Sequence, residues 1–255
     1  CPVQIQGPLS EDLMAKLAGE ELRDVPYYGI LETKVGGADC VISQTGFTGE
    51  KGYEIYVRDA HENAEKMWNA VLEAGEEFGL MVIAPAHHRR IAAGILSWGQ
   101  DLDHETSPFQ VNLSYQVPRN KEADYIGKEA LEKQRAIIDE GKAPFKMKMV
   151  GITLGGKEIT DYAPDFWIVT DTDENEVGFV TSPWWSPELE TNIALAWVPW
   201  DASEVGTKYM VKLPDEYSES PGVAVDAEIV DVPFRESVNP NKREVQAAKG
   251  LDYAD

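Results

Sequence analysis

The sequence is poor in cysteine, in basic residues and in long apolar runs. Its 255 residues include two cysteines, Cys1 and Cys40, too few for a disulfide framework or a cysteine-rich metal site. Lys and Arg number 23 against 45 Asp and Glu, so the formal net charge is −22. A chain this acidic is repelled by phosphate backbones and anionic bilayers, and no apolar run is long enough to span a membrane. These absences predict a reduced, cytoplasmic protein that binds neither nucleic acid nor membranes.

Several familiar catalytic patterns are missing as well. The sequence contains no P-loop and no GxGxxG, GxSxG or HExxH pattern. What is present is an ordinary globular composition, with 43% apolar and 27% charged residues, in a chain long enough for one large or two ordinary domains. Val3 and Ile5 alternate like the end of a strand that lacks a beginning. We therefore expect that an N-terminal portion of the protein precedes this sequence.

Before Pro144, apolar residues often recur at helical spacing. After Pro144, the pattern changes to short strands. The first expected helix begins at Ser10, which would cap it, and ends at Gly19. Three further helices are expected at His61–Ala74, Ala86–Ile95 and Ile126–Asp139. The expected early strands are Tyr28–Val35, Cys40–Ser43 and Tyr53–Val57. Six further strands, separated by turn residues, are Phe145–Leu154, Phe166–Thr170, Val177–Thr181, Asn192–Val198, Lys208–Leu213 and Ala224–Val230.

This change of pattern predicts an α+β protein with two domains. A mixed α/β body would occupy residues 1–141, an antiparallel β-barrel-like domain residues 142–235, and a tail residues 236–255. Regularly spaced short strands are typical of such small barrels or sandwiches.

The strand Tyr53–Val57 carries the first candidate site. If Tyr53 and Ile55 face a core, then Glu54 and Tyr56 share the opposite face, about 7 Å apart along the strand. A carboxylate on a rigid strand can accept two parallel N–H bonds from a flat amino-heterocycle. The alternative is that both side chains face water. The glycines of Gly46–Gly52 would let the preceding loop turn tightly and approach a ligand.

A second candidate is the histidine- and arginine-rich start of the helix expected at Ala86–Ile95. His87 and His88 are adjacent, so they point in different directions and do not form a joint metal site. The alternative is a solvated basic turn that includes Arg90. The acidic loop Gly99–Glu105 alternates oxygen side chains but lacks the mid-loop glycine and terminal glutamate of a calcium loop, which favours a structural role. No metal site is expected.

Several segments, read in order, resemble the folate-dependent aminomethyltransferase family. That family includes the glycine cleavage system T-protein and relatives that demethylate dimethylsulfoniopropionate or methoxylated aromatic acids. The matching segments cover nearly the whole chain and are Gln6–Pro8, Thr45–Ile55, Arg90–Gly94, Trp98–Asp101, Ser107–Phe109, Tyr125–Leu131, Gly178–Ser182, Ser186–Pro187 and Pro233–Phe234.

The resemblance implies a tetrahydrofolate site. Glu54 matches the family carboxylate that holds the pterin-type ring, and Trp98 falls where relatives carry an aromatic residue near the folate. With Tyr56 and Arg90 these residues form the expected cofactor-binding set. The catalytic residue stays unknown, because the segment preceding Gln6–Pro8 in the family holds much of the donor pocket, and His87 and His88 are the candidates here.

Departures from the family pattern favour its demethylase branch. Ala86 and His87 stand where an Arg and an Asp are usual, and Ala92 replaces an acidic residue. We therefore expect a demethylase that moves a methyl group from a small S- or O-methylated donor to tetrahydrofolate, with His87 or His88 protonating an aryl-ether leaving group. The alternatives are a glycine cleavage aminomethyltransferase and a non-catalytic folate-binding module. The identity of the donor and the formation of a homo-oligomer are left open.

Overall fold

A computed structural model describes residues 2–235 of the chain, which fall into two compact units, residues 2–86 and 87–235. Each unit is described by itself. Cys1 and the tail predicted at residues 236–255 lie outside the described residues. Within the described part, no helix is long and apolar enough to cross a membrane.

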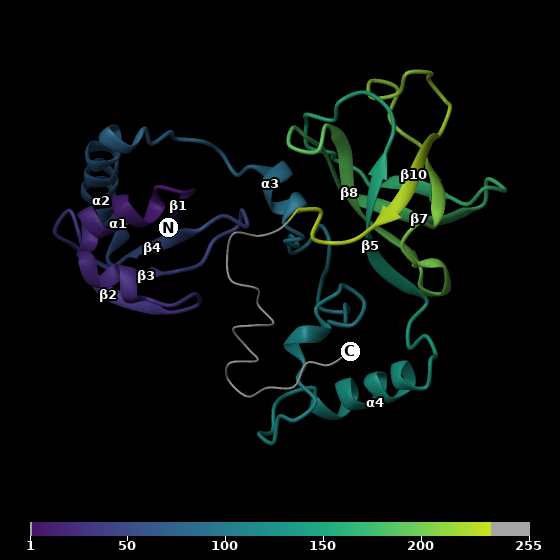
Figure 1. The fold of residues 1–255 in the computed structure, drawn as a ribbon, viewed down its shortest axis with the longest axis horizontal. Helices are drawn as coiled ribbons and strands as arrows, with labels where there is room; N and C mark the ends of the chain where they lie inside the picture. The colour runs from purple at the N-terminus through teal and green to yellow at the C-terminus, as the bar shows by residue number, and fades with distance from the viewer. Residues whose placement is uncertain (1, 236–255) are drawn as a thin grey trace. The chain divides into compact units, whose positions relative to one another are not determined.

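The first unit is a four-stranded antiparallel sheet with helices packed on one of its faces (Figure 1). The strand order is β1-β4-β3-β2, so β4 lies inside the sheet and pairs with both β1 and β3. The elements are β1 (Pro2–Gln6), α1 (Ser10–Ala18), η1 (Glu20–Asp24), β2 (Ile30–Val35), β3 (Ala38–Ser43), β4 (Gly52–Val57), α2 (Ala60–Gly75) and η2 (Glu76–Phe78).

Alternation along the strands decides which face of this sheet is buried. Tyr53 and Ile55 of β4 are fully buried in a core to which α1 and α2 also contribute apolar side chains, among them Met14 and Met67. The expected helix at Ser10 is confirmed, but Ser10 does not cap it. Its hydroxyl instead donates to the carbonyl of Lys51, 3.0 Å away, and so ties α1 to the loop before β4.

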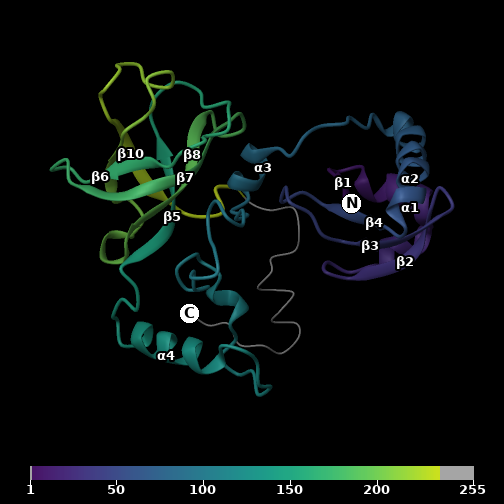
Figure 2. The ribbon, with the colours of Figure 1, turned by 180° about the vertical axis from the view of Figure 1, so that it is seen from behind.

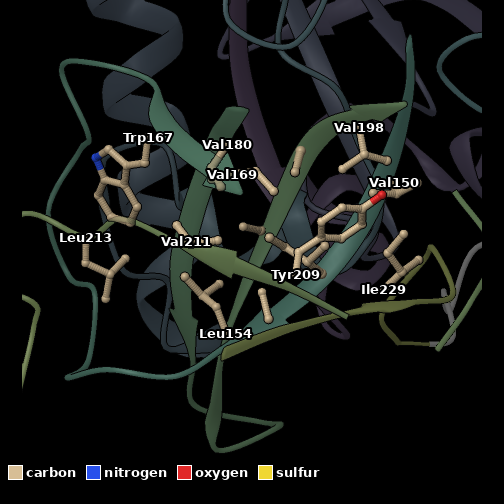
Figure 3. Packing of buried hydrophobic residues seen from close by; sticks show 14 of the residues in the cluster. Val150, Leu154, Trp167, Val169, Val180, Val198, Tyr209, Val211, Leu213 and Ile229 are labelled. Atoms are coloured by element: carbon tan, nitrogen blue, oxygen red, sulfur yellow. The ribbon is translucent and has the colours of Figure 1, made fainter. Parts of the chain in front are cut away.

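The second unit contains a closed six-stranded antiparallel barrel, seen from behind in Figure 2. The strand order around it is β10-β5-β8-β7-β6-β9, and inward-pointing apolar side chains such as Val150, Val169 and Tyr209 fill its interior (Figure 3). The predicted fold class, a mixed body followed by an antiparallel barrel, is confirmed. The elements are α3 (His87–Ala92), η3 (Ser114–Gln116), α4 (Lys128–Asp139), β5 (Met147–Leu154), β6 (Trp167–Thr170), β7 (Glu176–Ser186), β8 (Thr191–Pro199), η4 (Trp200–Ala202), β9 (Lys208–Val211) and β10 (Val225–Val230).

Residues 87–141, which the sequence groups with the first domain, pack with the barrel unit in the structure. Ile91 of α3 and Val111 lie in one buried cluster with Met149, Leu195 and Trp197 of the barrel strands. The outer face of β5 and β8 is therefore apolar as well as the inner face. The pattern of short strands cannot show which segment covers the outer face, because apolar residues occur on both faces of these strands.

The helix expected at Ala86–Ile95 is shorter, because it ends before Gly94. Gly94 has φ +67°, its N–H donates to the carbonyl of Ile91, and the N–H of Ile95 donates to the carbonyl of Arg90. This pair of bonds is the Schellman arrangement that closes many helices at a glycine. A side chain at this position would also meet Val232, with its Cβ 2.6 Å from a methyl carbon.

Candidate functional site

Glu54 lies on the helix-free face of the first sheet, where β1, β4 and β3 run side by side. The register places it opposite Gln4 of β1 and opposite Ser43 of β3. Its side chain is half-buried, whereas Tyr56, two residues further along the strand, is 42% exposed. The alternation that buries Tyr53 and Ile55 therefore presents a carboxylate and a phenol together on the opposite face, as the sequence predicts.

Three side chains hydrogen-bond the Glu54 carboxylate. Gln4 Nε2 donates to Oε1 at 3.0 Å, and Tyr56 OH donates to Oε2 at 3.3 Å. Thr45 Oγ1 donates to Oε2 as well, and it lies 2.6 Å from the hydroxyl of Ser43. These contacts orient the carboxylate in the plane of the sheet face before any ligand is present.

This arrangement leaves the carboxylate able to accept further hydrogen bonds. Oε1 accepts a hydrogen bond from Gln4, and a carboxylate oxygen has two lone-pair sites. On Oε2 the Tyr56 contact is the longer one and comes from an exposed side chain, so it is the bond that a ligand N–H would replace. The site thus suits a flat group with two neighbouring N–H donors.

Gln6 holds the loop that carries Thr45. Its Nε2 donates to the carbonyls of Ile5 and Thr45, and its Oε1 accepts from Thr48 Oγ1 at 2.8 Å. Gly46 and Gly52 make room for this side chain, because a Cβ at either position would lie 2.1–2.3 Å from its amide atoms. Gly46 and Gly52, for which the sequence predicts close approach of a ligand, therefore have a structural role: they leave space for the Gln6 side chain.

Arg90 belongs to the second unit and is 1% exposed, so it is not part of a solvated basic turn, although Arg89 beside it is exposed. Its guanidinium donates from Nη1 to Asp101 Oδ2 (2.8 Å) and to the Ile95 carbonyl (3.1 Å). It also donates from Nη2 to Ser182 Oγ (2.8 Å) and to Gln100 Oε1 (3.2 Å). These bonds are all internal, so the structure gives Arg90 a structural role, and its predicted contact with a cofactor stays a prediction.

Asp101 completes this buried network. Oδ1 accepts from the hydroxyls of Thr181 and Ser182, each at 2.6 Å, and Oδ2 accepts from the backbone N–H of Ser97 at 2.7 Å. The acidic loop considered from the sequence is thus anchored inward by its first carboxylate. Among residues 2–235, no group of three or more His, Cys, Asp or Glu side chains is arranged to hold a metal ion.

His87 lies next to Arg90 and between two aromatic rings. Its ring stacks on Trp184 with centroids 5.4 Å apart, and the Tyr162 ring is 5.5 Å away. Arg90 Nε donates to His87 Nδ1 at 3.4 Å, so the neutral ring carries its proton on Nε2. Burial, and then the positive charge of Arg90, lower the pKa of His87 below its usual 6.5.

His88 has a lowered pKa too. Burial is the main cause, and the charges of Arg89 and Arg235 add to it. Both histidines are therefore mostly neutral at physiological pH. A neutral imidazole is a poorer proton donor than an imidazolium, so this electrostatic setting does not favour their predicted role as general acids.

Trp98 is 62% exposed, in a tight loop closed by a hydrogen bond from Gly99 N–H to the Leu102 carbonyl. Its ring meets His104 edge to face, with centroids 5.1 Å apart. The structure thus brings Glu54 together with Tyr56, and His87 together with Arg90. Trp98 belongs to the loop of the second unit that also carries Gln100 and Asp101, two of the partners of Arg90.

Sequence reasoning missed the partners that position these groups, namely Gln4, Thr45, Asp101, Ser182 and the stacking role of Trp184. Gln4 alone carries a local signal, because it alternates with Val3 and Ile5 and so must face away from the core. The others depend on which distant segments come together.

Two domain families match the chain in order. Residues 1–121 match the GCVT N-terminal domain, and residues 148–235 match the glycine cleavage T-protein C-terminal barrel domain. Together these matches cover most of the sequence. The chain belongs to the glycine cleavage T-protein family.

Relatives in the glycine cleavage T-protein family are longer than this chain. An aminomethyltransferase of Geobacillus sp. (strain WCH70) is 33% identical over 233 residues, which are 90% of this chain and 59% of that protein. One of Clostridium botulinum (strain Okra / Type B1) is 34% identical over 225 residues, 87% of this chain and 57% of that protein. The chain therefore spans a little under three fifths of these relatives.

A solved structure supports the same fold. The glycine cleavage system aminomethyltransferase T from Bartonella henselae superposes with a TM-score of 0.68 at 23% identity, covering 92% of this chain and 60% of that one. The relatives with matching sequences are named aminomethyltransferases. They support the alternative considered from the sequence, a glycine cleavage T-protein, better than the demethylase that was preferred there.

Proposed function

We propose that the chain is part of a tetrahydrofolate-dependent aminomethyltransferase and that Glu54 holds the pterin-type ring of the folate. The observation that carries this proposal is the Glu54 carboxylate, set on an inner strand and oriented by Gln4 and Thr45. Membership in the glycine cleavage T-protein family supports it.

The residues present fit such a ring. The amino-pyrimidinone edge of a pterin offers an amino group and a ring N–H side by side, and the half-buried carboxylate can accept both. Such a charge-assisted pair contributes on the order of 1.5–3 kcal/mol to binding. The Tyr56 hydroxyl donates to Glu54 Oε2, and a ligand N–H would displace it from that oxygen. The Tyr56 side chain would then flank the ring.

Tetrahydrofolate, when bound, supplies the N5 amine that accepts the one-carbon unit. The task of this chain is then to place that amine, because correct placement of two reactants can provide several kcal/mol of the rate acceleration. Gln4 and Thr45 fix the carboxylate and so fix the ring. The neutral state of His87 and His88 supports a reaction in which neither histidine must donate a proton to an aryl-oxygen leaving group.

The donor we propose is an aminomethyl group rather than a methyl group. The names of the relatives support this choice. Against it stand Ala86 and His87, at the start of α3, and Ala92, at its end, which differ from the residues that the family usually carries there. The nature of the product distinguishes the two donors.

The test begins with binding. Titration calorimetry of the chain with tetrahydrofolate should give a dissociation constant that rises at least tenfold in Glu54→Gln, because an amide presents donors where an acceptor is needed. Glu65→Gln, an exposed glutamate on α2, is the matched control and should bind like the wild type. Equal affinity of all three proteins would remove Glu54 from the site.

A second assay addresses the donor. The protein is incubated with tetrahydrofolate and, separately, with an aminomethylated lipoyl carrier protein or a methylated sulfonium compound. Formation of 5,10-methylene-tetrahydrofolate from the carrier supports the proposal. Formation of 5-methyl-tetrahydrofolate from the small donor alone would contradict it and restore the demethylase interpretation.

A further inference from the structure

A pocket of about 190 Å³ lies in the second unit, between α4 and the segment from Val117 to Tyr125. One face of α4, from its first turn to its last, forms one wall. Four cationic side chains and two carboxylates line the pocket: Arg119, Lys121, Lys128 and Arg135, with Glu132 and Asp139. The wall therefore carries a net positive charge in a chain whose net charge is −22.

One of the two carboxylates is already bound within the wall. Asp139 accepts a bidentate pair of hydrogen bonds from Arg119, both 2.8 Å, and this pairing lowers the pKa of the carboxyl. Arg135 is held differently, since it donates to the Val117 carbonyl and its guanidinium lies 4.9 Å from the centre of the Phe109 ring. These contacts fix both guanidinium groups at the pocket.

The two lysines are held by neutral groups. Lys128 Nζ donates to the carbonyls of residues 121, 122 and 123, at 3.1, 3.4 and 3.4 Å. Lys121 Nζ lies 4.7 Å from the centre of the Tyr125 ring, and Tyr125 also lines the pocket. Within residues 2–235 neither ammonium group forms an ion pair, so both lysines can pair with an anion at the pocket.

From this arrangement we infer that the pocket binds a small multivalent anion, of the polycarboxylate or phosphate class. The volume corresponds to about six water molecules, which suits a small molecule better than a protein segment. Lys121 and Lys128 would pair with the anion, while Arg119 and Arg135, held by their contacts within the wall, would add positive potential at the pocket. This site is independent of the folate contact proposed at Glu54, because it uses none of the same residues.

The experiment is titration calorimetry of the whole chain at pH 7.5 with citrate and, separately, with inorganic pyrophosphate. Binding of either anion is expected, and the tighter of the two identifies the chemical class. Lys128→Gln and Lys121→Gln should each raise the dissociation constant about tenfold. Lys142→Gln removes the same charge from a lysine that is paired with Glu140 and does not line the pocket, so it should change the constant less than twofold.

Two results would overturn the inference. One is the absence of binding by both anions at millimolar concentration. The other is binding that persists unchanged in the Lys121→Gln, Lys128→Gln double variant, which would place the anion elsewhere. Lys121→Gln keeps the test decisive if Lys128→Gln disturbs the loop, because the Lys121 ammonium group lies over the Tyr125 ring and, within residues 2–235, holds no loop carbonyl.

Discussion

Arg90 Nη1 and Asp101 Oδ2 lie 2.8 Å apart, and their side chains are 1% and 0% exposed. Few ion pairs among residues 2–235 are shielded from water in this way; the pair between Lys133 and Glu129, for example, is more than 70% exposed on both sides. The buried pair joins α3, the loop after it and strand β7, because Ser182 and Thr181 bond the same carboxylate.

Removing the charge of Asp101 should therefore destabilise the protein strongly. Asp101→Asn leaves the buried Arg90 without its counter-charge, and we expect a loss of about 3–5 kcal/mol in the free energy of unfolding. Urea denaturation measures it, with Glu129→Gln as the control for an exposed pair, expected to change by less than about 0.5 kcal/mol. A loss below about 1 kcal/mol in Asp101→Asn would mean that the pair is not buried as described.

Gly52 is expected to resist even the smallest substitution. A Cβ there would lie 2.6 Å from the Ile5 carbonyl oxygen and still closer to the Gln6 amide, so β1 would have to move away from β4. Gly52→Ala should cost about 1–3 kcal/mol in urea unfolding. Gly155→Ala is the control, because its nearest neighbours stand at ordinary contact distance, 3.6–3.8 Å. Equal stability of both variants would disprove the close approach.

The lowered pKa of His87 predicts a pH dependence with a definite sign. Between that lowered pKa and 6.5, the unfolded state binds a proton that the folded state does not, so this residue makes the protein less stable as the pH falls through that window. His87→Gln should lose less unfolding free energy between pH 7.5 and pH 5 than the wild type. An NMR titration midpoint for His87 at or above 6.5 would contradict the prediction.

Trp98 should matter for binding rather than for stability. Its ring is mostly exposed and rests only on the edge of His104, so Trp98→Ala should lower the free energy of unfolding by less than about 1 kcal/mol. If it contacts the folate as its position in the family implies, the affinity for tetrahydrofolate should fall severalfold. Intact affinity in a stable Trp98→Ala protein would remove this residue from the predicted set.

Much of this fold is predictable because local patterns agree with the final packing. Regularly spaced turn residues identify the barrel strands, and alternation identifies the exposed side of β4, where Glu54 and Tyr56 lie. The same reasoning fails at Arg90, which follows the polar residues His87, His88 and Arg89. Its burial depends on Asp101 and Ser182, 11 and 92 residues away, and no local pattern encodes such partners.

The candidate site is likewise predictable where a local pattern marks it and unpredictable where it depends on distant residues. Glu54 is recognisable because it interrupts an apolar strand, whereas Thr45 reaches it only because Gln6 draws the preceding loop inward. The early end of α3 could have been read from Gly94, since a glycine that follows the last apolar position of a short helix is a common stop signal.

The network around Asp101 also bears on the order of events in folding. Its hydrogen bonds to Thr181 and Ser182 span 80 and 81 residues, and contacts of such long sequence separation are slow to form because a large loop must close first. The Arg90 charge then stays hydrated until β7 has reached its place in the barrel. Interactions made this late are largely absent from the transition state, so weakening them should hasten unfolding far more than it slows refolding.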